Sequence, residues 1–298
     1  MNHIITDNKK LAQQLNLYYW DNNKDHLVNV SFAIASRAFA KLLLSTECPN
    51  LKCIQLTSAG FDGVDTKLAR QKGITICNAA NVYNVGMAEF VVYALLMHAK
   101  RYHHSIKKRS IRLLRGYHYI TELAGKTVGI LGAGNIGGQI AKRLEAFEMH
   151  VWGYDINKNP RPHFEQIFTE ENLNEFLTKC DYIVNCMPLF PATEGMLCSS
   201  WFQQMKPNVT IVNVGRKRII NDKDLIAFLK SNKDATAILD MFEKFPNPLT
   251  NPYRRLSNVL VLPGVTAISR EIDKKLLALC HENILRFQQG QVLLNIIN

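Results

Sequence analysis

A glycine-rich turn between an apolar strand and a helical segment constrains the fold of this chain more than any other feature. The turn has the pattern Gly132-x-Gly134-x-x-Gly137; it follows the apolar run Thr127–Leu131 and opens a helical pattern over Ile136–Phe147. In such a strand–turn–helix unit, the free N–H groups and the partial positive charge of the helix N-terminus bind the pyrophosphate of a dinucleotide. The pattern therefore predicts a Rossmann-type domain, with a glycine-rich turn that holds no cofactor as the alternative.

The position of one carboxylate indicates which dinucleotide is bound. Asp155 lies eighteen residues after Gly137, just past the next apolar run, His150–Tyr154. A carboxylate at that place accepts hydrogen bonds from the ribose hydroxyls of NAD and repels the 2′-phosphate of NADP. Lys158 and Arg161 lie just beyond it and would tolerate that phosphate. NAD is therefore the expected cofactor, and NADP is the less favoured alternative.

Short apolar runs alternate with helical segments along most of the chain. Strands this apolar, separated by helices, are typical of parallel sheets that are covered on both faces. The sequence therefore predicts an α/β fold with two doubly wound parallel sheets in series. The expected strands are Val30–Ala35, Cys53–Thr57, Ile74–Cys77, Thr127–Leu131, His150–Tyr154, Tyr182–Cys186, Thr210–Val214, Ala235–Asp240 and Val259–Leu262, and the expected helices include Arg37–Leu44, Val64–Gln71 and one from Val85 to about Lys107.

Composition and charge limit the class of protein. A length of 298 residues suits two domains, and the content of 47% hydrophobic and 20% charged residues is that of a globular protein. The formal net charge of +11 suits nucleic acid or anionic small molecules equally well. The longest apolar run, Phe90–Met97, is too short to span a bilayer, so no membrane partner is expected.

The cysteines and the N-terminus indicate a cytoplasmic protein. Seven cysteines, an odd number, include no Cys-x-x-Cys pair, which is typical of reduced thiols in a reducing compartment. The first ten residues are polar and lack the apolar core of a signal peptide. No cluster of His, Cys and Asp has the spacing of metal ligands, so no metal site is expected.

Several segments resemble one enzyme family. The run Glu122–Gly137 resembles the D-isomer-specific 2-hydroxyacid dehydrogenases, which include phosphoglycerate dehydrogenases and glyoxylate/hydroxypyruvate reductases. Other segments resemble this family's motifs in the family's order, over the chain from about Leu51 onwards. They are Ser58–Asp65, Asn81–Glu89, Met187–Leu189 with Thr193, Met205–Pro207, Asn213–Arg216, Ile238–Asp240 and Asn258–Pro263.

The resemblance implies how the domains and the site are organised. A Rossmann-type cofactor domain, residues 92–273, would be inserted into a smaller flavodoxin-like substrate domain formed by residues 1–91 and 274–298. The protein would be a homodimer through the cofactor domain and would act on a small 2-keto or 2-hydroxy carboxylate. The residues expected to bind the cofactor are Gly132, Gly134, Asn135, Ile136, Gly137, Asp155, Met187, Pro188, Thr193, Val214, Gly215, Asp240 and Gly264.

The resemblance also assigns the substrate contacts. Backbone N–H groups around Ser58, Ala59 and Gly60 would hold the carboxylate, unless this segment is an ordinary strand-to-helix turn. Arg216 would be the catalytic arginine that pairs with the carboxylate and polarises the keto oxygen, with a surface arginine as the alternative. Tyr83 would either bond a substrate oxygen at the edge of the cleft or simply pack there.

Two proton-transfer positions depart from the family. Gly264 stands where the family has the proton-donating histidine after the last strand, and Phe245 stands where a glutamate supports that histidine. Glu243, two residues away, is a poor substitute. Losing a positioned general acid typically costs about 10² to 10⁴ in rate. The prediction is therefore an NAD-dependent 2-hydroxyacid dehydrogenase-like protein, with a catalytically silent NAD-binding sensor or regulatory protein as the alternative.

A basic segment offers a third, weaker hypothesis. Lys100–Arg115 is rich in lysine and arginine but has no recognisable nucleic-acid-binding module. A solvated helix end and subunit-contact loop explains its charge more simply. We therefore do not expect nucleic acid to be a partner.

Overall fold

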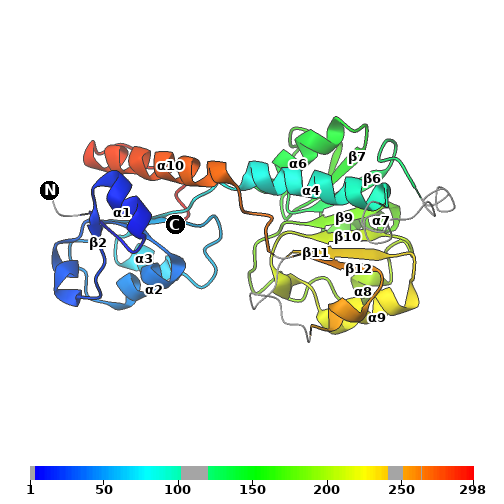
Figure 1. The fold of residues 1–298 in the computed structure, drawn as a ribbon, viewed down its shortest axis with the longest axis horizontal. Coiled ribbons are helices and arrows are strands. Elements are labelled where there is room, and N and C mark those ends of the chain that lie inside the picture. Colours follow the sequence, from blue (N-terminus) through cyan, green and yellow to red (C-terminus); the bar gives the residue numbers. More distant parts are fainter. Residues whose placement is uncertain (1–3, 102–119, 241–250, 263) are drawn as a thin grey trace. The chain divides into compact units, whose positions relative to one another are not determined.

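The computed structural model describes residues 4–101, 120–240, 251–262 and 264–298. The chain forms two compact units, one of residues 1–83 with 268–298 and one of residues 84–267 (Figure 1). The sequence put the boundaries inside two helices, at 91/92 and 273/274. In the structure each of these helices, α4 (Asn84–Ala99) and α10 (Arg270–Gln288), belongs wholly to one unit.

The smaller unit contains a five-stranded sheet in the order β2-β1-β3-β4-β5, and every pair of strands is parallel. This is the flavodoxin-like order, and it confirms the predicted class of this domain. The first two strands along the chain, β1 and β2, were not predicted; they are only three and two residues long. The strands are β1 (Ile4–Thr6), β2 (Tyr18–Tyr19), β3 (Phe32–Ala35), β4 (Cys53–Leu56) and β5 (Thr75–Cys77).

Helices cover both faces of this sheet because alternate strand residues point to opposite sides. Ala33 and Ala35 pack with α2 (Arg37–Ser45) and α3 (Thr66–Gln71). Phe32 and Ile34 pack with α1 (Lys9–Leu15) and α10. A short 3₁₀ helix, η1, spans Lys24–Asn29.

The larger unit contains a seven-stranded parallel sheet in the order β12-β11-β10-β9-β6-β7-β8 (Figure 1). The order reverses beside β6, as in a Rossmann fold, so the predicted class is confirmed. β8 was not predicted from the sequence. The strands are β6 (Thr127–Leu131), β7 (His150–Tyr154), β8 (Gln166–Phe168), β9 (Tyr182–Asn185), β10 (Thr210–Asn213), β11 (Thr236–Leu239) and β12 (Val259–Val261).

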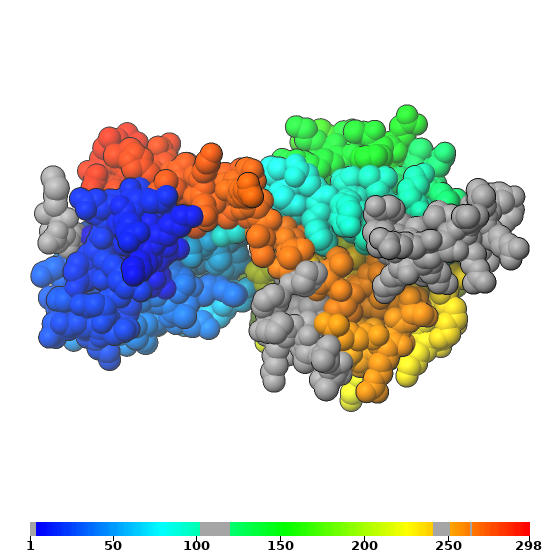
Figure 2. Space-filling view, viewed as in Figure 1, coloured from blue at the N-terminus to red at the C-terminus, as the bar shows by residue number. Residues whose placement is uncertain are grey.

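Two layers of helices cover this larger sheet. One face packs in a single hydrophobic cluster with α7 (Leu173–Lys179), α8 (Ser199–Phe202) and α9 (Asp222–Ser231). Elsewhere α6 (Asn135–Glu145) contacts β6 and packs along α4, and Figure 2 shows their green and cyan side chains in contact. The described part of this unit also contains the 3₁₀ helices η4 (Glu170–Asn172), η5 (Lys217–Ile219) and η6 (Pro252–Arg255).

The long helix after residue 84 is shorter than the sequence predicted. We expected a helix from Val85 to about Lys107, but α4 ends at Ala99. Lys100 and Arg101 form a turn, and the backbone of Arg101 is left-handed with φ 54°, which cannot continue a right-handed helix. Most of the basic segment, like Glu243 and Phe245, lies outside the described residues. Within the part of the chain that is described, no helix is long and apolar enough to cross a membrane.

Candidate dinucleotide-binding site

The glycine-rich turn lies at the carboxyl end of the central strand β6. Gly132 has φ 93°, a conformation that favours glycine, and its N–H donates to the carbonyl of Tyr154 at 2.9 Å. A Cβ added to Gly132 would stand 3.3 Å from the backbone of Met187, which lies in the loop after β9. The backbone conformation of the turn therefore favours glycine, and the loop that follows β9 leaves little room for a side chain.

The other two glycines of the pattern have different surroundings. A Cβ on Gly137 would stand 2.1 Å from the carbonyl oxygen of Gly132, so only glycine lets α6 pack this close to the turn. A Cβ on Gly134 would meet no protein atom within 4 Å. Gly134 is exposed and is the N-cap of α6, and as a glycine it supplies no side-chain hydrogen bond to the first turn of the helix.

This arrangement fits the pyrophosphate of a dinucleotide. The first-turn N–H groups of α6, at Asn135 and Ile136, have no acceptor within the helix, and the helix dipole adds partial positive charge. The open space at Gly134 lets a ligand approach the backbone. Gly137 packs against the backbone of the protein itself, whereas Gly134 faces the solvent, where a ligand can reach it.

Asp155 stands beside the same turn. Its Oδ2 accepts a hydrogen bond from the N–H of Ala133 at 2.9 Å, and its Oδ1 lies 3.4 Å from a guanidinium nitrogen of Arg161. Arg161 also donates to the carbonyl oxygen of Ala133. The carboxylate and the guanidinium therefore bond the N–H and the carbonyl of one residue of the glycine-rich turn, Ala133. Nothing in the sequence pointed to the bond from Arg161 to Ala133.

The loops after β9 and β10 bring further expected residues to the same edge of the sheet. Met187 and Val214 are buried there. A Cβ on Gly215 would stand 3.0 Å from both the carbonyl oxygen of Met187 and the side-chain nitrogen of Asn185, so the two loops touch. Pro188 is exposed, and its carbonyl accepts a hydrogen bond from the Thr193 hydroxyl at 2.8 Å. Asn185, which was not predicted to matter, is completely buried.

Arg216 follows directly after Gly215 and is partly buried. Its Nη1 donates to the carbonyl of Gly215 at 3.4 Å. Lys217, in the position of the family's usual glycine, forms a 2.6 Å ion pair with Asp222 at the start of α9. The Lys217 ammonium is therefore held by α9. The role of Arg216 toward a substrate stays a prediction.

The turn after β12 is built on a buried carboxylate. Asp240 is 1% exposed, and its two oxygens accept hydrogen bonds from the N–H groups of Gly264 at 2.9 Å, Val265 at 3.2 Å and Thr266 at 2.7 Å. The hydroxyl of Thr266 donates to the same carboxylate. Gly264 has φ 77°, in the left-handed region. Residue 264 therefore has a backbone conformation that favours glycine.

The loop after β4 belongs to the smaller unit. Its carbonyl groups are held inside that unit: the carbonyl of Ser58 accepts from the N–H of Ala79 at 3.0 Å, and that of Ala59 from the Asn78 amide at 2.8 Å. The Ser58 hydroxyl donates to the carbonyl of Gly60 at 2.7 Å. The loop is thereby held in one shape, and its contact with a carboxylate stays a prediction.

Tyr83 supports the same loop. Its hydroxyl donates to the carbonyl of Thr57 at 2.6 Å, and burial raises the pKa of the phenol. The hydroxyl proton is therefore used within the protein, which fits the packing role that the sequence left open.

Cys186, beside the glycine-rich turn, is held as an unreactive, protonated thiol. The thiol of Cys186 donates to the carbonyls of Leu131 and Gly132 at 3.2 and 3.1 Å, and desolvation raises its pKa to about 12. A thiol with such a pKa is not a nucleophile at neutral pH. Among the described residues, no group of three or more His, Cys, Asp or Glu side chains is placed to hold a metal ion.

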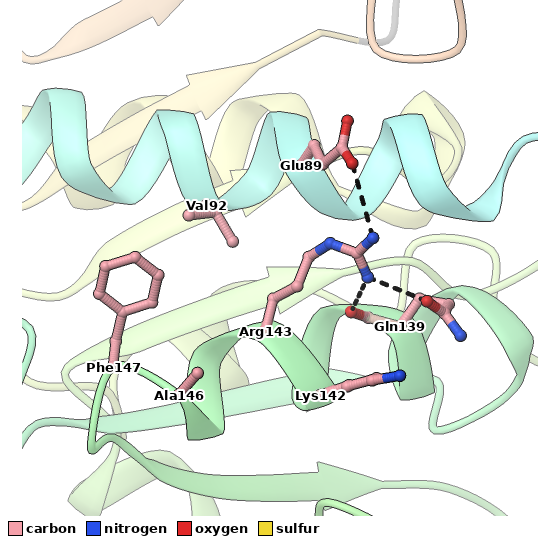
Figure 3. Close-up of a pocket in the computed structure, with 7 residues that line it drawn as sticks. All are labelled: Glu89, Val92, Gln139, Lys142, Arg143, Ala146 and Phe147. Carbon is pink, nitrogen blue, oxygen red and sulfur yellow. Dashed lines mark hydrogen bonds and ion pairs between the residues drawn. The ribbon is translucent and has the colours of Figure 1, made fainter. Parts of the chain in front are cut away.

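A hollow of about 480 Å³ lies between α4 and α6, away from the glycine-rich turn (Figure 3). Arg143 lies between the two helices, where it donates to both the carbonyl and the side-chain oxygen of Gln139 and lies 3.6 Å from Glu89. Ala146 and Phe147 line it at the C-terminal end of α6. This hollow therefore lies apart from the N-terminus of α6, where the phosphate-binding features are.

Comparison with known proteins decides the family. A family model described as "D-isomer specific 2-hydroxyacid dehydrogenase, NAD binding domain" matches residues 90–265, more than half of the chain. This chain belongs to the D-isomer specific 2-hydroxyacid dehydrogenase family. This chain is similar to a hydroxypyruvate reductase from Blautia hydrogenotrophica. The two are 31% identical over 259 residues, which are 85% of this chain and 80% of that protein.

Other members of the family agree in sequence and in fold. A D-3-phosphoglycerate dehydrogenase from Methanocaldococcus jannaschii is 33% identical over 256 residues, 83% of this chain but 48% of that protein. The chain thus spans about half the length of this relative. The solved structure of a D-isomer specific 2-hydroxyacid dehydrogenase family protein from Aeromonas salmonicida matches with a TM-score of 0.83 and 28% identity, covering 100% of this chain and 99% of that one.

Proposed function

We propose that this chain is an NAD-dependent oxidoreductase that reduces a small 2-keto acid to the corresponding 2-hydroxy acid. The observation that carries the proposal is the space at Gly134, which a Cβ would fill without touching the protein, at the N-terminus of α6. Family membership supplies the class of reaction. When bound in its reduced form, the dinucleotide supplies a hydride to the keto carbon.

The chain's own residues would bind and polarise the substrate. Arg216 would pair with the substrate carboxylate and draw electron density from the keto oxygen, because a guanidinium has two parallel donors. The N–H groups of Ser58, Ala59 and Gly60 would hold the same carboxylate. Asp155 would accept the ribose hydroxyls and favour NAD. Arg161, beside it, is the residue that would admit NADP.

The proton for the new alkoxide would come from water. Gly264 has no side chain to donate it, and its N–H is already bonded to Asp240. Slow turnover is therefore expected, lower by about 10² to 10⁴ than with a positioned acid. A keto acid whose carboxylate is held by Arg216 would still react faster than a free one, because it would be oriented beside the cofactor.

The test is oxidation of NADH and NADPH at high enzyme concentration with glyoxylate, hydroxypyruvate, pyruvate and branched 2-keto acids. The control is Gly134→Val, which should leave the fold intact but obstruct the pyrophosphate. Gly138→Val matches it, because a Cβ at Gly138 also meets no protein atom within 4 Å. We expect turnover in the wild-type protein and in the Gly138 variant only.

A catalytically silent NAD-binding sensor is the competing proposal, and the turn at Gly264 favours it. Binding of NADH with no turnover above the Gly134 control would reject the enzyme and leave the sensor. An Arg216→Lys variant separates the two further. In an enzyme it should raise KM for the keto acid or lower kcat, whereas NADH binding should stay unchanged.

The proposed assembly is a homodimer in the cytoplasm. A dimer through the larger unit is what the family resemblance implies, and seven free cysteines suit a reducing compartment. Light scattering of the purified chain tests the dimer, and a mass of one chain at micromolar concentration would reject it. Neither proposal involves nucleic acid, and a salt-sensitive shift of random DNA would overturn that view.

A further inference from the structure

Three buried polar side chains stand in a row at the carboxyl edge of the larger sheet. Asn185 ends β9, Asn213 ends β10, and Asp240 follows β11; they are 0%, 2% and 1% exposed. We call these three residues the carboxyl-edge ladder. Buried polar groups are costly unless they are hydrogen-bonded, so their partners show what they hold in place.

The two asparagines pair across neighbouring strands. They are aligned in the strand register, and the Asn185 side-chain nitrogen donates to Asn213 Oδ1 at 2.8 Å. Each also bonds the loop that follows its own strand. Asn185 Oδ1 accepts from the N–H of Met187 at 3.2 Å, and Asn213 Oδ1 accepts from the N–H of Gly215 at 3.1 Å. The pair thus joins the two loops at the second residue of each.

Asp240 extends the row by one strand. Its N–H donates to the carbonyl of Asn213 at 3.3 Å, and its carboxylate holds the N–H groups of the turn from Gly264 to Thr266. Three successive backbone N–H groups around one anion form a rigid concave turn. The ladder therefore fixes the loops after β9, β10 and β12 relative to one another.

These loops lie on one side of the switch point at β6. Strands β6, β7 and β8 form the half that carries Asp155, whereas the loops after β9, β10 and β12 belong to the other half. In a Rossmann fold each half receives one mononucleotide of the dinucleotide. If the cofactor binds as proposed above, the adenosine half lies toward Asp155 and the nicotinamide half toward the ladder.

The geometry points to Asn185 and Asn213 as positioning residues for the nicotinamide half of the cofactor, a role that no sequence motif assigned to them. They act through the backbone of Met187 and Gly215, not by touching the ligand. This inference rests on the proposed dinucleotide binding. Its specific consequence is that damage to the ladder weakens binding of the nicotinamide end and spares the adenosine end.

The test compares the binding of NADH with that of ADP-ribose, which lacks the nicotinamide, by calorimetry on the full chain. The variant is Asn213→Ala. The control is Thr210→Val, at the other end of the same strand: Thr210 is 1% exposed and its hydroxyl pairs with His98 at 2.9 Å. Both variants lose a buried polar group from β10, but only one lies in the ladder.

We expect Asn213→Ala to raise the Kd of NADH about tenfold and to change that of ADP-ribose less than twofold. Thr210→Val should change neither. Asn213→Ser, whose hydroxyl still reaches the N–H of Gly215, should lie between Asn213→Ala and the wild type. An equal loss for both ligands, or no loss for either, would overturn the inference. A wild-type chain that binds neither ligand would instead reject the proposed function, and this inference with it.

Hydrogen exchange without ligand gives an independent measurement. The amides of Met187 and Gly215 should exchange at least tenfold faster in Asn213→Ala than in the wild type, and at the wild-type rate in Thr210→Val. If Asn213→Ala does not fold, Asn213→Ser provides the comparison at the amide of Met187 alone, because its hydroxyl still accepts from the N–H of Gly215. Unchanged exchange at both amides in a folded Asn213 variant would overturn the role given to the ladder.

Discussion

The carbonyl oxygen of Gly132 occupies the space that a side chain at Gly137 would need: a Cβ built there would stand 2.1 Å away from it. Both residues belong to one sequence pattern. A Cβ built on Gly134, in the same pattern, would meet no protein atom within 4 Å. One glycine therefore serves the packing of the protein, and another leaves space for a ligand. The two should respond differently to the same substitution.

Gly137→Ala should destabilise the fold, and Gly134→Ala should not. Overpacking at a site that cannot relax typically costs about 1 to 3 kcal/mol. The alanine at 134 should instead lower the affinity for NADH, because its methyl group stands where the pyrophosphate approaches. Urea unfolding and NADH fluorescence titration measure the two effects. A loss of stability at 134 equal to that at 137 would contradict this assignment.

Asp155 and Arg161 should set the choice between NADH and NADPH. Asp155→Ser removes the carboxylate that, in the proposed function, would accept the ribose hydroxyls, and it leaves the guanidinium of Arg161 for a 2′-phosphate. A hydrogen bond to a charged group is worth about 1.5 to 3 kcal/mol, so NADH affinity should fall about tenfold or more while NADPH affinity rises. Adding Arg161→Gln should cancel the gain for NADPH. Titration of both cofactors checks this, and an NADPH affinity that Arg161→Gln leaves unchanged would contradict it.

Replacing Gly264 should carry a conformational cost. Its φ of 77° lies in a region where a residue with a Cβ loses about 1 to 2 kcal/mol. Gly264→Ala should therefore lower the urea midpoint, whereas Gly138→Ala should not. Gly264→His with Phe245→Glu should gain reductase activity at some loss of stability, since histidine tolerates the left-handed region better than most residues. A fully stable Gly264→Ala would argue against the turn described here.

Stability should fall in alkali, partly because of Cys280. This thiol is completely buried, and desolvation raises its pKa to about 12, against about 8.5 in an unfolded chain. Above pH 8.5 the unfolded chain loses the proton that the folded chain keeps, so stability is fully present below that pH and is lost toward pH 12. The thiol should contribute a slope of about 1.4 kcal/mol per pH unit.

Unfolding of the wild type and of Cys280→Ala at pH 7, 9 and 10.5 measures this slope. The variant loses packing at every pH but should lose less additional stability between pH 9 and 10.5. Parallel pH profiles for the two proteins would show that Cys280 does not contribute.

The sequence was sufficient for much of the fold because the signals were local. Apolar runs of four to six residues predicted the central strands, and the turn with its three glycines predicted the Rossmann unit that the sheet order confirms. The two-residue strand Tyr18–Tyr19 was missed because so short a run carries no periodic pattern. The end of α4 at Ala99 was missed because it depends on the left-handed backbone of Arg101, not on a glycine or proline.

By itself, the sequence determined the class of the protein, the place of the phosphate-binding turn and the lack of a side chain at position 264. Only the tertiary structure decided how these features are used. It separated Gly137, which packs, from Gly134, which faces open space, and it joined Asn185, Asn213 and Asp240 from three strands into one row. The physical reason is that hydrogen bonds between residues 28 or 26 positions apart, as for Asn185 with Asn213 and Asp240 with Thr266, leave no periodic pattern in the chain.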